Sequence, residues 1–109
     1  MDAEVAWILQ AAGATLAAGR WCQGAEARDE QGHPAHPLAA TARTFSMTGA
    51  LYRASGFDGT PERRQIYQAA VSSVAAGLDL PISKWNDSPG RRLDQVLEAI
   101  CSAGRRPCG

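Results

Sequence analysis

Two short segments of the chain place tryptophan beside charged and amide side chains, and these residues could carry chemistry. The first segment is 20–29 (Arg-Trp-Cys-Gln-Gly-Ala-Glu-Ala-Arg-Asp), and the second is 85–87 (Trp-Asn-Asp). The candidate site residues are Trp21, Gln23, Arg28, Asp29, Trp85, Asn86 and Asp87. An arginine can pair with a carboxylate through two parallel hydrogen bonds, and indole rings can shield such a pair from water. If the two segments meet, we expect Arg28 to pair with Asp87 or with Asp29.

Three interpretations of this cluster remain open. In the first, it contacts a protein or a small ligand, because Trp and Arg are favoured at binding hot spots. In the second, the cluster is purely structural and the protein self-associates: Asn86 and Asp87 stabilise a turn, and Gln23 forms hydrogen bonds with backbone groups at a helix end. In the third, it is an enzyme pocket in which Asp29 or Asp87 acts as a general base. A non-catalytic binding or regulatory module is favoured over an enzyme, since the sequence has no phosphate-binding glycine loop, nucleophile elbow or paired-cysteine motif.

A metal site is the weaker alternative. His33 and His36 form an H-x-x-H pair, to which Cys22, Asp29 or Glu30 could add further ligands for zinc. The prolines of this segment argue against a helix that presents both imidazoles on one face. We therefore predict that the protein holds no metal and no cofactor.

Charge and hydropathy narrow the choice of partners. Eleven Lys and Arg residues balance eleven Asp and Glu residues, so no overall positive charge favours nucleic acid. The apolar stretch 5–18 has an acidic flank and, at 14 residues, is shorter than the roughly 20 needed to cross a bilayer. We read it as a buried helix and expect no membrane partner. Three cysteines without metal-type spacing indicate reduced thiols and a cytoplasmic protein.

The elements that must position these residues are predicted to be helices. Apolar periodicity and capping residues place four of them at about 3–18, 38–54, 60–78 and 88–104. No alternating run is long enough to predict a strand. The fold class is therefore all-α: a compact bundle of four main helices with irregular connections, one domain over 1–109, with a frayed tail at 105–109.

Several details of this bundle can be tested. Leu38 and Cys101 fall on apolar helix faces and are expected in the core. Gly49 lies inside the second helix, where another backbone is expected to approach it closely. The end of the first helix and the start of the last can adjoin in an antiparallel pair. Ala-rich faces on the first and third helices make a homodimer possible.

As a set, three motifs resemble an uncharacterised family of small bacterial and phage proteins. They are the W-x-Q-G-A-x-x-R pattern that begins at Trp21, the Gly-Ala-Leu of 49–51 and the late Trp-Asn-Asp of 85–87. The resemblance spans most of the chain, although Cys22 stands where the family more often has a hydroxyl residue. It implies a shared fold and no named activity.

Overall fold

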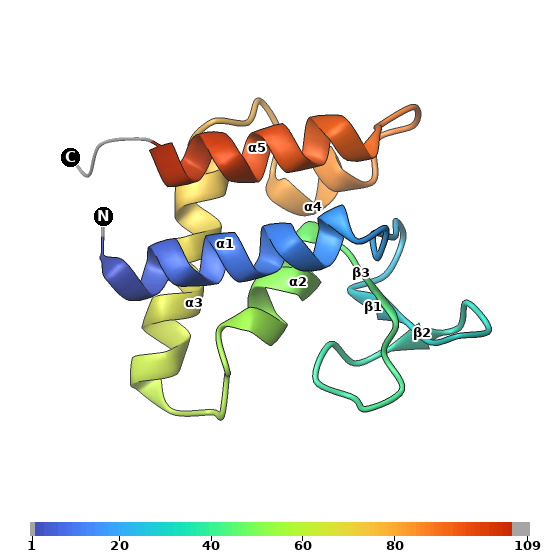
Figure 1. The fold of residues 1–109 in the computed structure, drawn as a ribbon, viewed down its shortest axis with the longest axis horizontal. Helices are drawn as coiled ribbons and strands as arrows, with labels where there is room; N and C mark the ends of the chain where they lie inside the picture. Colours follow the sequence, from blue (N-terminus) through green and yellow to red (C-terminus); the bar gives the residue numbers. More distant parts are fainter. Residues whose placement is uncertain (1, 106–109) are drawn as a thin grey trace.

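The structure, a computed structural model, describes residues 2–105 and combines helices with a small sheet (Figure 1). In chain order the elements are α1 (Ala3–Ala17), β1 (Ala27–Arg28), β2 (Pro34–Ala35), β3 (Thr44–Phe45), α2 (Met47–Ala54), α3 (Pro61–Ala75), α4 (Ile82–Asn86) and α5 (Leu93–Arg105). The strands form an antiparallel sheet in the order β2-β1-β3. The all-α prediction is therefore wrong, and the fold is mixed.

Each strand of the sheet is only two residues long. Ala27 in the central strand pairs with Ala35 on one side and with Phe45 on the other, and its side chain is fully buried. Alternation of polar and apolar residues needs at least four residues to be visible in a sequence. Strands of this length therefore leave no periodic signal.

The sheet also replaces the first half of the predicted second helix. Phe45 pairs with β1, so α2 begins only at Met47, where the Ser46 side chain accepts a hydrogen bond from the Gly49 amide. Leu38 lies before the strand and is 42% exposed, so its predicted place in the core is wrong.

The chain between α3 and α5 also differs from the prediction. Residues 82–86, expected to be a loop, form α4, and α5 begins at Leu93 rather than near Ser88. Ser88, the residue at which the last helix was predicted to begin, donates its hydroxyl to the Lys84 carbonyl of α4. Arg105 belongs to α5, whereas the rest of the predicted frayed tail, 106–109, lies outside the described residues.

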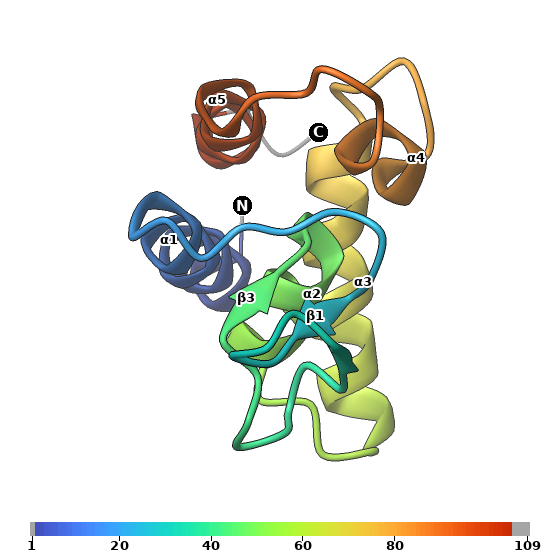
Figure 2. The same ribbon diagram turned by 90° about the vertical axis from the view of Figure 1, so that its right-hand side faces the viewer.

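The core lies between α1 and the helices around it. α1 packs against α5, α2 and α3, and α5 runs alongside α1 in Figure 1, while Figure 2 shows the sheet beside α2. The prediction of a buried helix over 5–18 holds for one face of α1, whose buried residues are Val5, Ile8, Leu9, Ala12 and Leu16. No helix within residues 2–105 combines the length and apolar character that a membrane crossing requires.

Gly49 provides a stability test, because its α-carbon lies against the backbone of residue 26. A Cβ at this position would overlap the carbonyl oxygen of Glu26. Gly49→Ala is expected to lower the free energy of unfolding by about 3 kcal/mol, since the clash is with backbone that cannot move aside. Urea unfolding followed by circular dichroism measures this change.

Gly13→Ala is the matched control within a helix. The added Cβ would lie 3.7 Å from Ile100 Cγ2, an ordinary contact, so this variant should gain up to about 1 kcal/mol from helix propensity. Equal effects of the two substitutions would contradict the close approach at Gly49.

Candidate functional site

The structure brings the two tryptophan-bearing segments together at the end of α4. The Trp21 indole N–H donates to Asn86 Oδ1 at 2.8 Å, and the Gln23 amide donates to the carbonyls of Asn86 and Ser88 at 2.9 and 3.1 Å. The backbone N–H of Gly24 donates to Asp87 Oδ1 at 3.0 Å. Residues more than 60 positions apart in sequence thus share one polar network.

Asn86 is the centre of this network. Its Oδ1 accepts from the Trp21 indole and from the Met47 amide, while its Nδ2 donates to the Cys22 carbonyl and to Asp87. Asn86 is 1% exposed. A buried amide with all these bonds formed joins the 20–29 segment, the first turn of α2 and α4 into one unit.

Arg28 and Asp29 have partners other than those expected. The Arg28 guanidinium donates twice to the Gln23 carbonyl and once to the Gly32 carbonyl, and none of the four ion pairs within residues 2–105 includes it. Asp29 Oδ1 accepts from the amides of Gln31 and His33 in the turn between β1 and β2. Both side chains therefore stabilise the loop in which they lie.

Trp85 lies outside the network that binds Trp21. It is 9% exposed, and the Arg91 guanidinium stacks 3.7 Å from the centroid of its ring. The Trp85 side chain lines a different cavity, together with Leu78 and Arg91. The two indoles therefore do not enclose a common ion pair.

Two adjoining cavities open beside the network. The smaller, of about 230 Å³, is lined by Gly24, Ala25, Glu26, Ser46, Ser83, Asn86 and Asp87. The larger, of about 370 Å³, is lined by Glu26, His36, Pro37, Thr48, Tyr52, Tyr67 and Ser83, and we call it the Glu26 pocket. Glu26 and Ser83 belong to both linings, so the pocket continues into the place where the two segments meet.

The Glu26 carboxylate is bound at the first turn of α2. Both of its oxygens lie 2.8 Å from the Thr48 hydroxyl, and the backbone carbonyl of Glu26 accepts from the Ser46 amide. The glycine at 49 permits this approach, since it leaves room for the Glu26 backbone. Glu26 as a residue is exposed.

Aromatic rings form the other wall of the pocket. Tyr52 contacts His36 and Tyr67 edge to face, with ring centroids 5.6 and 5.2 Å apart. Burial raises the pKa of the Tyr67 phenol, and the nearby Glu26 carboxylate and Tyr52 raise it further. The Tyr67 phenol is therefore protonated at neutral pH and can both donate and accept a hydrogen bond.

Only part of this pocket was predicted from the sequence. Glu26 lies within the predicted 20–29 segment and His36 within the histidine pair, but neither Thr48 nor the two tyrosines were site candidates. These pocket residues come from separate elements and share no spacing. The close approach predicted at Gly49 was the one available sign that the 20–29 segment meets α2.

The histidine pair is divided between two environments. The His33 ring lies 3.7 Å from Asp29, while His36 Nδ1 accepts from the Leu38 amide and its ring contacts Tyr52. Within residues 2–105, no group of three or more His, Cys, Asp and Glu side chains is arranged to hold a metal ion.

Comparison with known proteins identifies the family of this chain, and no function is known for that family. The model of a family of unknown function, DUF6197, matches residues 1–106. No curated protein and no solved structure matches the chain. The expected membership of an uncharacterised family is thereby confirmed.

The Asn86 network can be tested by removing its central amide. Asn86→Ala leaves the half-buried indole N–H of Trp21 and the buried Met47 amide without their acceptor, and we expect a loss of about 3 kcal/mol in the free energy of unfolding. Gln68→Ala, which removes an exposed amide from α3, should change it by less than about 0.5 kcal/mol. Chemical denaturation measures both; similar small losses would contradict the central role of Asn86.

The cysteines provide a test of local environment. Burial raises the pKa of the half-buried Cys22 thiol, whereas Cys101, predicted to be core, is exposed. Because the thiolate is the reactive form, iodoacetamide at pH 8 should modify Cys101 well before Cys22. Peptide mass spectrometry reads each site, and urea-unfolded protein serves as the control in which the rates converge. If Cys22 were modified faster than Cys101 in the folded protein, the half-buried position of Cys22 would be wrong.

Proposed function

Because the chain belongs to a family of unknown function, its role must be argued from the site, and we propose that it is a binding module whose Glu26 pocket holds a small organic cation. The ligand would carry an ammonium, substituted ammonium or guanidinium group. The observation that carries this proposal is the chemistry of the lining: a carboxylate faces aromatic rings, and no lysine or arginine lines the pocket.

Charge favours a cation over an anion. Glu26 lines both cavities, and Asp87 adds a second carboxylate in the smaller one. Neither lining contains Lys or Arg, so an anionic ligand would meet only like charge. A cation would instead form charge-assisted hydrogen bonds with Glu26, which are the stronger class.

The aromatic wall suits the same ligand. Cations bind favourably over the faces of tyrosine rings, and the effect is greater where water is excluded. Tyr52 and Tyr67 are both half-buried. The Tyr67 phenol and the Thr48 hydroxyl add neutral polar groups that can orient a substituent. The volume of about 370 Å³ suits a small molecule.

The tryptophan cluster then acts mainly as the support of this pocket. The side chains of Trp21 and Gln23 both donate hydrogen bonds to Asn86, and the Asp87 carboxylate accepts one from the Gly24 amide. These bonds fix the course of the chain just before Glu26. Within the same proposal, the protein comes from a bacterium or phage, and reduced thiols suit a cytoplasmic location.

Glu26→Gln tests the proposal, because it removes the negative charge while keeping the shape of the side chain. A panel of small amines and guanidines is screened by thermal shift, and the best ligand is titrated by calorimetry. We expect the substitution to raise its Kd between about tenfold and a hundredfold, in keeping with the loss of a charged hydrogen bond.

Glu30→Gln is the matched control, since Glu30 is an exposed glutamate in the turn between β1 and β2. It should leave the Kd of the same ligand unchanged. Binding that Glu26→Gln does not weaken, or a preference of the pocket for anions, would disprove the assignment.

A further inference from the structure

Helix α1 carries a second face, uncharged and apolar except for Gln10, which points away from the core. The exposed residues Ala3, Trp7, Gln10, Ala14 and Ala17 follow one another at alternating steps of four and three. This spacing aligns them as one stripe, as in a coiled-coil seam. The Trp7 side chain is 60% exposed. A helix that is apolar on opposite faces is expected to be covered on both, and the core covers only one.

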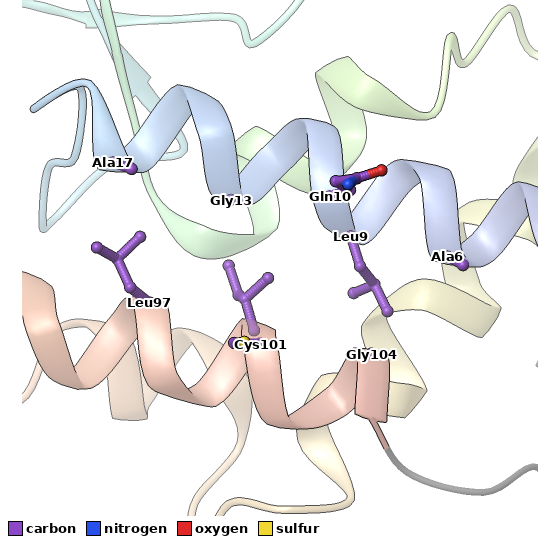
Figure 3. A pocket seen from close by; sticks show the side chains of 9 residues that line it. Ala6, Leu9, Gln10, Gly13, Ala17, Leu97, Cys101 and Gly104 are labelled. Atoms are coloured by element: carbon purple, nitrogen blue, oxygen red, sulfur yellow. The ribbon is translucent and has the colours of Figure 1, made fainter.

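An apolar groove runs beside this stripe, between α1 and α5. It has a volume of about 520 Å³, and Figure 3 shows Leu9 and Leu97 pointing into the space between the two helices. Small residues on α1, Gly13 and Ala17 among them, form one of its walls. No charged side chain lines it. The groove shares no residue with the Glu26 pocket.

We propose that a second copy of this chain covers the stripe, with the two α1 helices packed antiparallel. The charges at the ends of α1 indicate both the partner and the direction. Asp2 and Glu4 lie at the start of the helix, Arg20 follows its end, and residues 5–18 between them carry no charge. Antiparallel packing places the acidic end of one copy beside the arginine of the other, whereas parallel packing would bring like charges together.

These charges set direction more than strength. Asp2 already caps α1, and Glu4 forms an ion pair with Arg63 of the same chain. Burial of Trp7 and the alanine stripe must therefore supply most of the affinity.

The charge pairing also fixes the approximate register. When residues 2–4 of one α1 face residues 18–20 of the other, Trp7 lies within one turn of the partner's Ala14. Gln10 lies close to its own copy, near a two-fold axis. Gln10 and Ala17, which line the groove, lie one turn before and after Ala14 on the same side of the helix. An indole placed at the partner's Ala14 therefore reaches the mouth of the partner's groove. The two-fold symmetry repeats this contact, so each groove receives one tryptophan.

Sedimentation equilibrium over a concentration series tests the assembly. Wild-type protein is expected to be a dimer, and Ala14→Glu should raise the dimer Kd at least about tenfold, because it buries an unpaired charge in the interface. Leu80→Glu is the control: Leu80 is 42% exposed and belongs neither to α1 nor to the lining of the groove, so this variant should remain dimeric. Circular dichroism and thermal melting verify that both variants fold. A monomeric wild type, including one whose groove binds an apolar dye, or a dimer that Ala14→Glu leaves intact, would overturn the proposal.

Crosslinking tests the direction of the helices. In a chain whose Cys22, Cys101 and Cys108 are replaced by serine, Gln10→Cys should form a disulfide between copies on oxidation. Ala3→Cys should not, because the two Ala3 positions would lie about 24 Å apart along the helices at about 1.5 Å per residue. Efficient crosslinking through Ala3→Cys would show parallel helices and would overturn the proposed arrangement.

Discussion

A single buried amide holds the segment after α1, the first turn of α2 and the end of α4 together. Asn86 gives both of its polar atoms to partners from three separate parts of the chain: the segment after α1, the first turn of α2, and its own neighbour Asp87. Such a network stabilises one arrangement strongly, because any other would leave polar groups buried without partners. Within the segment 20–29, Ala27 is buried in the core and Trp21 packs against it. The hydrogen bonds to Asn86 add to these contacts and fix the course of the chain between the two residues.

The position of Glu26 follows from that course and from one glycine. Once Trp21, Gln23 and Gly24 are tied to the end of α4, the chain passes directly over the start of α2. Gly49 lets the Glu26 backbone come into contact with the helix, and the Ser46 amide then binds its carbonyl. The backbone thus supplies the anchorage, which leaves the Glu26 side chain at the rim of the pocket.

The sequence predicts those parts of the molecule in which local signals are long or chemically specific. α1 shows several turns of apolar periodicity, and Thr60 and Pro61 mark the start of α3. The two-residue strands carry no such signal, and the Ser-Pro pair at 88–89 resembles a helix start although the Ser88 hydroxyl binds Lys84. The tryptophan segments could be expected to meet because both flank helix ends. The pocket walls could not, since they depend on tertiary packing of single side chains.

The buried polar side chains of the described residues are satisfied within the protein. Among the described residues, no buried side-chain nitrogen or oxygen lacks a hydrogen-bond partner. None of these buried atoms therefore needs a ligand as its hydrogen-bond partner. The two proposed binding surfaces are exposed: Glu26 lies beside aromatic rings at one place, and the uncharged face of α1 carries Trp7 at another. Because these surfaces share no lining residue, a substitution in one can be used to test its role while the other is left intact.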